Sequence, residues 1–206
     1  MNIINPLPAS EVITPSILYY GTPVLLMTTR NECGCDNISP LSSSWALGDR
    51  IVLGIGTAGK GYENLTRERQ CVLNLPDAGL WQQVEQLAPT TGKDPVPESK
   101  RLLGFVYEPD KFGRCGLSAA PSELVKPARI AECPLQIEAA VCHIRIPEGS
   151  PHFAIVETQA LRVHAHPGIL REGRHIDPAK WNPLIYNFRH YFGLGTELGR
   201  TFRAET

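Results

Sequence analysis

The sequence predicts a mainly β fold, a closed or nearly closed antiparallel barrel with helical insertions. Three observations support this class: short apolar runs outnumber helical patterns, turn residues separate the runs, and the helical patterns fall in connections instead of alternating with strands. The chain has 206 residues, with 18 glycines and 18 prolines dispersed among the apolar runs, so they indicate turns and not disorder. A barrel can use this length as one domain, and we expect a single domain over residues 1–206.

Three buried strands are predicted in the first part of the chain. They are residues 21–30 (GTPVLLMTTR), 50–56 (RIVLGIG) and 71–75 (CVLNL). The stretch ISPLSSSWA, residues 38–46, is too polar and too rich in serine for a core strand, so we expect a loop there. A short helix is expected from Tyr62 onward.

Helical patterns follow the third strand. Asp77 can cap a helix over residues 78–87, whose apolar face would comprise Leu80, Val84 and Leu87. After a loop at 89–97 we expect a brief helical piece at 98–103, and an irregular segment at 111–120 (KFGRCGLSAA).

A long hairpin is predicted in the second half. Apolar residues alternate from Leu135, and a change of phase near His143 indicates a bulge. After the turn PEGSP, residues 152–166 return as the second strand. A last helical candidate begins at Asp177, before an aromatic tail.

Charge and cysteine content restrict the function classes. The formal net charge is −1, which argues against nucleic acid or an anionic membrane surface as the main partner. The sequence has no 18-residue apolar run, and its first residues lack the features of a secretory signal, so we expect a cytoplasmic protein. In that compartment the six cysteines are expected to be free, mostly buried thiols. Paired C-x-x-C spacings are absent, so no metal site is predicted.

The glycine-rich string GIGTAGKG, residues 54–61, follows a strand and could approach a phosphate. It satisfies G-x-G-x-x-G with Asp77 about 20 residues on, as in a Rossmann loop, and it nearly matches a P-loop. The next strand follows too soon for a βαβ unit, and Gly61 stands where a P-loop has Ser or Thr. A phosphate cradle of backbone N–H groups with Lys60, or a plain turn, are the other interpretations.

A second candidate is the cluster of hydroxyl and amide side chains between the first two strands. Such groups can bind a phosphate or the polar edge of a planar ring, or they can form a solvated turn. The cluster consists of Asn37, Ser39, Ser42, Ser43 and Ser44.

Five segments follow one another in a characteristic order: PVLLMTTR (23–30), NISPLSSS (37–44), the strand that ends in GIG, Lys60-x-x-x-Asn64, and VLNLP (72–76). Their order and spacing resemble the flavin reductase-like family, whose domain is an FMN-binding split barrel. The resemblance covers a core at about residues 20–165, with a C-terminal extension at 166–206.

The resemblance implies a homodimer with FMN, or alternatively FAD, near the subunit interface, and NAD(P)H as the reductant. It implies that the flavin contacts Thr29, Arg30, Asn37, Ser39, Ser42, Ser43, Ser44, Lys60 and Asn64. His152 resembles a histidine that lies near the nicotinamide site in some members. Whether a monooxygenase partner takes the reduced flavin stays open.

The leading hypothesis is therefore an NAD(P)H-dependent flavin reductase. Hydride transfer is the work of the cofactor, so a catalytic acid or base is not obligatory. Two alternatives stay open: a flavin- or haem-binding split barrel that carries electrons or senses redox state, and a nucleotide-binding protein that uses residues 54–61 as a Rossmann loop. The first is favoured by G-S-P-H before the long strand, where family members usually have G-D-H.

Overall fold

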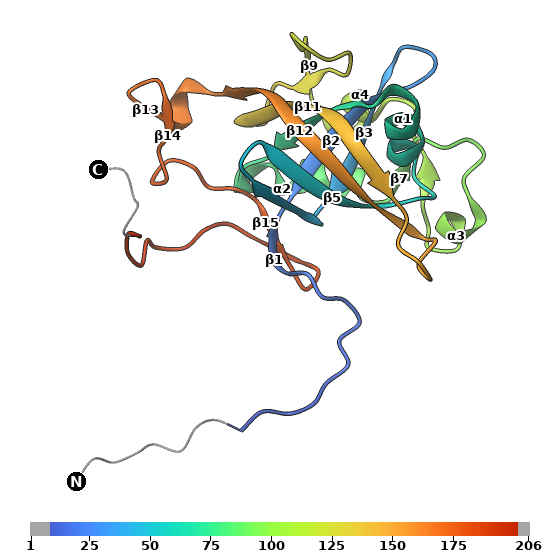
Figure 1. Ribbon diagram of the computed structural model, residues 1–206, viewed down its shortest axis with the longest axis horizontal. Helices are drawn as coiled ribbons and strands as arrows, with labels where there is room; N and C mark the ends of the chain where they lie inside the picture. The colour runs from blue at the N-terminus through green and yellow to red at the C-terminus, as the bar shows by residue number, and fades with distance from the viewer. Residues whose placement is uncertain (1–8, 202–206) are drawn as a thin grey trace.

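A curled antiparallel sheet of seven strands dominates the computed structural model, which describes residues 9–201 (Figure 1). The strand order is β3-β2-β6-β11-β12-β5-β4. This half-barrel confirms the predicted mainly β fold with helical insertions. The seven strands are β2 (Leu25–Arg30), β3 (Asp36–Leu41), β4 (Ser44–Leu47), β5 (Arg50–Gly56), β6 (Gln70–Leu75), β11 (Leu135–Arg145) and β12 (Phe153–Ala165).

Shorter elements occupy the connections. The helices are α1 (Lys60–Glu68), α2 (Trp81–Leu87), α3 (Glu98–Arg101) and α4 (Lys111–Cys115), with 3-10 turns η1 (Ala78–Leu80) and η2 (Pro167–Ile169). The short strands are β1 (Tyr20–Pro23), β7 (Thr90–Thr91), β8 (Val106–Tyr107), β9 (Ala119–Ala120), β10 (Arg129–Ile130), β13 (Leu170–Arg171), β14 (His175–Ile176), β15 (Ile185–Asn187) and β16 (His190–Phe192). Because β15 pairs with both β1 and β16, the C-terminal extension returns to the first strand.

The core lies on both faces of the sheet. Along β2, Leu25 and Met27 pack into one apolar cluster, and Leu26 packs into the other. Successive side chains of a strand point to opposite faces, so a strand covered on both sides requires an unbroken apolar run. The predicted buried strand at 21–30 is therefore confirmed for residues 25–30, whereas residues 20–23 belong to β1, which pairs with β15 in a separate sheet. Within residues 9–201, no helix combines the length and the apolar character that crossing a membrane requires.

The long hairpin is confirmed. Strands β11 and β12 pair antiparallel, with register shifts between Glu138 and Ala139 and between Val141 and His143. The second shift is the bulge expected near His143. The helix capped by Asp77 is also present, as η1 and α2, and the Asp77 carboxylate accepts a 2.9 Å hydrogen bond from the N–H of Gly79.

The prediction of a loop over residues 38–46 is wrong, because strands β3 and β4 occupy most of this stretch. Strand β3 pairs in register with β2 from Leu25↔Leu41 to Arg30↔Asp36, and β4 pairs with β5. Both are edge strands of the sheet. An edge strand tolerates polar residues that a central strand would bury without partners. The serine content therefore argued only against a central strand, and it is compatible with the edge strands β3 and β4.

Two further predictions are corrected. Residues 111–115 form helix α4 instead of irregular chain: the Asp110 carboxylate accepts from the N–H of Gly113, and Gly116 ends the helix with φ of 62°. The helix expected from Asp177 is a turn, in which the Asp177 carboxylate accepts from the N–H of Ala179 at 3.0 Å. Pro183 follows and lacks the N–H that a longer helix would need.

Candidate functional site

A cavity of about 360 Å³ opens between the start of α1, strands β3 and β5, and the connection that runs from α2 to α4. Its volume falls in the range typical of sites for small molecules. Met27, Leu41 and Ile55 supply apolar surface from the sheet, and Tyr62 does so from α1. Residues far apart in sequence complete the lining, with Phe105 from one connection and Tyr186 and Tyr191 from the C-terminal extension.

The charged residues of the cavity lining are all basic. Lys60, Lys100 and Lys111 line it, together with His152, and no aspartate or glutamate among residues 9–201 does. The ammonium of Lys100 lies 5.2 Å from the centroid of the Phe105 ring. Burial, with the charge of Lys93 as a smaller cause, lowers the pKa of Lys100. The lining therefore favours an anionic ligand.

Lys111 is the most buried of these cations, with 3% of its surface exposed. Its ammonium donates a 2.7 Å hydrogen bond to the carbonyl oxygen of Ile38 on β3. Burial, followed by the charge of Lys100, lowers the pKa of Lys111 to about 7. A buried amine without a carboxylate partner is costly, and an anionic ligand in the cavity would offset that cost.

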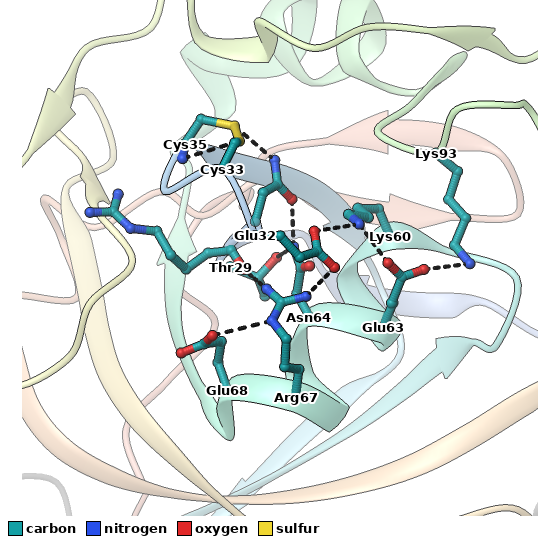
Figure 2. Close-up of polar contacts among 12 residues, drawn as sticks. Thr29, Glu32, Cys33, Cys35, Lys60, Glu63, Asn64, Arg67, Glu68 and Lys93 are labelled. Atoms are coloured by element: carbon teal, nitrogen blue, oxygen red, sulfur yellow. Dashed lines mark hydrogen bonds and ion pairs between the residues drawn. A yellow bond between two sulfur atoms is a disulfide. The ribbon is translucent and has the colours of Figure 1, made fainter.

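Lys60, at the first position of α1, differs because it already has two acidic partners (Figure 2). Its ammonium lies 2.8 Å from Glu32 and 2.5 Å from Glu63. Burial alone would lower the pKa of Lys60, but the hydrogen bonds to these carboxylates raise it. Hydrogen bonds from Lys60 and Lys93 lower the pKa of Glu63 to about 2. Lys60 thus stays charged at neutral pH.

Two buried asparagines, Asn37 and Asn64, hydrogen-bond to residues near the cavity. The amide of Asn64 donates to the Thr29 hydroxyl at 3.1 Å and to the Asn31 side-chain oxygen at 2.7 Å. The amide of Asn37 donates to the Ser39 hydroxyl at 3.0 Å. The Oδ1 atoms of Asn37 and Asn64 have no hydrogen-bond partner among residues 9–201. Unpartnered buried oxygens such as these are frequently satisfied by a ligand or water.

The expected site residues fall into three groups. Ser39, Lys60 and His152 line the cavity. Thr29, Asn37 and Asn64 form the hydrogen-bonded layer described above, outside the lining itself. The third group lies outside the lining and consists of Arg30, Ser42, Ser43 and Ser44.

Two residues of the third group have other partners. Arg30 pairs with Asp36 at 3.0 Å. The Ser43 hydroxyl donates to the Tyr19 hydroxyl at 2.9 Å, and the Ser43 carbonyl accepts from the N–H of Gly54 at 2.8 Å. Contact of these residues with a cofactor stays a prediction.

Sequence reasoning missed Lys100, Phe105, Lys111 and the two tyrosines of the lining. Lys111 carried a usable signal, because Asp110 before it and Gly116 after it are typical ends of a short helix. Lys100, Phe105 and the two tyrosines carried no such sequence signal, because only the folded chain brings the α2–α4 connection and the C-terminal extension to the cavity.

The sheet excludes a Rossmann loop and a P-loop at residues 54–61. Both motifs join parallel strands through a helix. Strands β5 and β6, which flank α1, run in opposite directions, because every pairing between them in the sheet is antiparallel. The glycines instead bring α1 close to β3: a Cβ on Gly61 would lie 2.7 Å from the Ser39 hydroxyl oxygen.

The cysteines require a correction. Cys71, Cys115 and Cys133 are buried free thiols and Cys142 is a half-buried one, as expected. Cys33 and Cys35 are instead joined by a disulfide. Both are exposed, in the turn between β2 and β3.

Comparison with protein families decides the classification of the chain. The family described as "Flavin reductase like domain" matches residues 17–195. The chain belongs to the flavin reductase-like family. The resemblance of the five sequence segments is thereby confirmed, and the fold is the split barrel of this family.

Individual relatives extend the comparison. The chain is 55% identical over 194 residues to the uncharacterized protein YdfE of Bacillus subtilis (strain 168), and the match covers 94% of each chain. Flavoredoxin of Desulfovibrio vulgaris (Miyazaki F) superposes with a TM-score of 0.78 at 21% identity, covering 95% of this chain and 99% of the other. Nitrilotriacetate monooxygenase component B from Bacillus cereus gives a TM-score of 0.71 at 18% identity, covering 97% and 98%. At these identities the two structures show a shared fold.

Membership in the flavin reductase-like family makes flavin the class of cofactor to test against the cavity. The residues present fit such a group. Flavin nucleotides carry a negative phosphate and a planar ring with polar edges. The cavity offers cations without acidic residues in the lining, an apolar strip from β2, β3 and β5, and hydroxyl and amide groups of Ser39 and Asn37.

Proposed function

We propose that this protein is an NAD(P)H-dependent flavin reductase that binds FMN in the cavity between α1 and the α2–α4 connection. The observation that carries the proposal is the pair Lys100 and Lys111, two cations that face the cavity without a carboxylate in its lining. The proposal is consistent with membership in the flavin reductase-like family. We name FMN as the flavin because its phosphate monoester concentrates its negative charge at one end, which the lysines of the lining can bind.

Lys111, Lys60 and Ser39 have different roles in the proposed binding of FMN. Lys111 is held at the wall of the cavity by the Ile38 carbonyl and can donate its remaining N–H groups to an anionic oxygen. Lys60 is held by Glu32 and Glu63 and contributes a fixed positive charge at the start of α1. Ser39 is oriented by the Asn37 amide and can donate its hydroxyl proton to a ligand.

The reductant would enter from the side of His152. This residue precedes β12 and is exposed, and its carbonyl accepts from the N–H of Thr57 at 3.0 Å, which fixes it beside the glycine-rich turn. The bound flavin supplies the hydride-accepting chemistry. The protein needs to hold the two rings in contact and to exclude water, and Tyr186 and Tyr191, which also line the cavity, provide aromatic surface for both purposes.

The test combines a flavin titration with anaerobic reduction. Purified protein should quench FMN fluorescence and gain thermal stability with FMN, and NADH or NADPH should then bleach the flavin absorbance without oxygen. A protein that neither quenches FMN nor gains stability contradicts the proposal. Binding without bleaching by either nucleotide contradicts the reductase activity and identifies an electron carrier instead.

A pair of variants tests the cavity itself. In Lys111→Met the FMN dissociation constant should rise about 10-fold or more, because one hydrogen bond to a charged group contributes about 1.5–3 kcal/mol. The matched control is Lys126→Met, an exposed lysine paired with Glu68 at 2.9 Å and absent from the cavity lining. Equal affinity of the two variants would place FMN elsewhere.

We also propose that the protein is a homodimer. Trp45 and Leu47 on edge strand β4 are 59% and 75% exposed, and exposed apolar residues on a sheet edge are typical of surfaces that a partner covers. Sedimentation equilibrium should give twice the mass of the chain, and Trp45→Lys should shift the distribution toward the monomer. A monomer at micromolar concentration contradicts this proposal.

The monooxygenase partner stays a proposal as well. The structural relative from Bacillus cereus is named as component B of a monooxygenase. By analogy, we propose that reduced FMN from this protein serves a separate flavin-dependent monooxygenase. Retention of all reduced flavin on the protein during gel filtration would contradict a diffusible product.

A further inference from the structure

The disulfide between Cys33 and Cys35 closes a very small ring on the protein surface (Figure 2). The two cysteines are separated by Gly34 alone, in the turn between β2 and β3. Both are exposed, whereas the free thiols of Cys71 and Cys133 are buried. A disulfide that closes so short a loop removes little entropy from the unfolded chain, so a stabilising role explains little of its presence.

Each sulfur of the disulfide has an N–H donor. The side-chain amide of Asn31 donates to Cys35 Sγ at 3.3 Å, and the backbone N–H of Cys35 donates to Cys33 Sγ at 3.4 Å. Such donors stabilise a thiolate, and a stabilised thiolate is the better leaving group in thiol–disulfide exchange. The site therefore combines access for an attacking thiol with stabilisation of the sulfur that departs.

The same turn is connected to α1 through side chains (Figure 2). Glu32, next to Cys33, accepts hydrogen bonds from Lys60 at 2.8 Å and from Arg67 at 2.5 Å. Asn31 accepts from the Asn64 amide at 2.7 Å. These contacts hold the turn against the helix, so that the disulfide is presented on an ordered support and not on a free loop.

We propose that Cys33 and Cys35 form a dithiol–disulfide redox site that exchanges electrons with dithiols. A thiolate of the dithiol attacks one sulfur, the Cys33–Cys35 bond breaks, and the departing cysteine thiolate takes a proton. The second thiol of the reductant, as its thiolate, then attacks the mixed disulfide and releases the other cysteine, which is protonated in turn. Two electrons and two protons reach the protein, and the dithiol leaves as its own disulfide.

Alkylation of the full chain tests this proposal. Air-oxidised protein in native buffer is treated with N-ethylmaleimide before and after incubation with dithiothreitol or with reduced thioredoxin, and each cysteine is then located by peptide mass. Modification of Cys33 and Cys35 should rise together from near zero to near complete, and it should be blocked again by oxidised glutathione once the dithiothreitol has been removed. Faster reduction by thioredoxin at equal concentration assigns a protein dithiol as the partner, and the reverse assigns a small one.

Two results overturn the proposal. Alkylation of both cysteines without any reductant shows that the disulfide does not form. Reduction of the disulfide only after the protein has been denatured shows that dithiols do not reach it in the folded protein. The buried Cys71 serves as the internal control, because it should stay unmodified in native buffer throughout.

A further experiment tests whether Asn31 stabilises the Cys35 thiolate, as distinct from only holding the turn in place. In a Cys33→Ser background, the pH dependence of Cys35 alkylation reports the stability of its thiolate. Adding Asn31→Leu should move that profile to higher pH, because the N–H donor to Cys35 Sγ is lost. An unchanged profile contradicts stabilisation by Asn31. None of these measurements uses flavin, so a failure to bind FMN leaves this test intact.

Discussion

The ammonium of Lys111 donates a 2.7 Å hydrogen bond to the carbonyl oxygen of Ile38, and no other residue among those described hydrogen-bonds to it. Helix α4 thereby holds a cation against edge strand β3, at the wall of the candidate flavin cavity. Burial, followed by the charge of Lys100, lowers the pKa of Lys111 to about 7. In the free protein the Lys111 amine is thus about half protonated near pH 7, and an anionic ligand in the cavity would favour its ammonium form.

Lys111 should make the stability of the free protein depend on pH. Its pKa is about 7 when folded against the usual 10.5 when unfolded, so between these values the unfolded chain binds more protons and stability rises with pH. Lys111→Met should lose this dependence. From pH 7 to pH 9, the free energy of unfolding of the wild type should gain up to about 2 kcal/mol relative to the variant. Urea unfolding at the two pH values measures it, and a constant difference would contradict the lowered pKa.

Lys60 and Ser43 should differ in their effect on FMN binding. Lys60 lines the cavity, whereas Ser43 donates to the Tyr19 hydroxyl outside it. We expect Lys60→Met to weaken FMN binding by about 1–2 kcal/mol, less than the loss of an unpaired cation would, because the ion pairs with Glu32 and Glu63 already engage the Lys60 ammonium. Ser43 stays a predicted flavin contact, but its hydroxyl already donates to Tyr19, so Ser43→Ala should weaken FMN binding by less than Lys60→Met does. Fluorescence titration compares the two dissociation constants, and an unchanged value in Ser43→Ala would contradict a flavin contact of Ser43.

Gly61→Ala should destabilise the packing of α1 on the sheet. An added Cβ would lie 2.7 Å from the Ser39 hydroxyl oxygen and 2.8 Å from the terminal methyl carbon of Met27. Both atoms end side chains, but Met27 is buried in the core and the Ser39 hydroxyl is held by the Asn37 amide, so we expect an overpacking cost of about 1–3 kcal/mol, which exceeds the gain of alanine over glycine in a helix. Gly168→Ala is the matched control, since nothing lies within 4 Å of its added Cβ. Denaturant unfolding should separate the two variants, and a Gly61 variant as stable as the control would refute the close approach.

Glu138→Ala should be among the most destabilising substitutions in the protein. Glu138 is fully buried, and its carboxylate accepts from the backbone N–H groups of residues 123–125 and lies 2.7 Å from His164 Nε2. Removing one side of a buried charged network costs about 3–5 kcal/mol. The exposed Glu148→Gln serves as the control and should change stability by less than about 0.5 kcal/mol.

Glu138 also has a pH signature. Burial alone would raise its pKa, but the backbone N–H groups and His164 together hold it below the usual 4.5. A carboxyl group with a lowered folded pKa stabilises the protein fully above its unfolded pKa, and this contribution is lost as the pH falls through the folded value. The stability gap between the wild type and Glu138→Gln should therefore narrow below about pH 4.5. A gap that stays constant down to pH 3 would contradict the assignment.

Local pattern was sufficient for the central strands and the long hairpin. The unbroken apolar run that contains Leu25, Leu26 and Met27 required burial on both faces, and the change of phase at His143 matched a real shift of register. The same reasoning failed at the sheet edges. Serine-rich residues 38–46 were excluded from the strands because polarity was compared with a core strand, whereas an edge strand leaves part of its surface to solvent.

The sequence by itself determined the family and the classes of residue available for binding, because the order of the segments around Asn37, Lys60 and Asn64 can be recognised without coordinates. Only the tertiary structure decided which of these residues face one cavity. Lys100 and Lys111 reach it because the α2–α4 connection folds back over β3, and Tyr186 and Tyr191 reach it because β15 pairs with β1. Pairing of distant strands and the burial of a charge depend on contacts across the whole chain, and no local pattern encodes them.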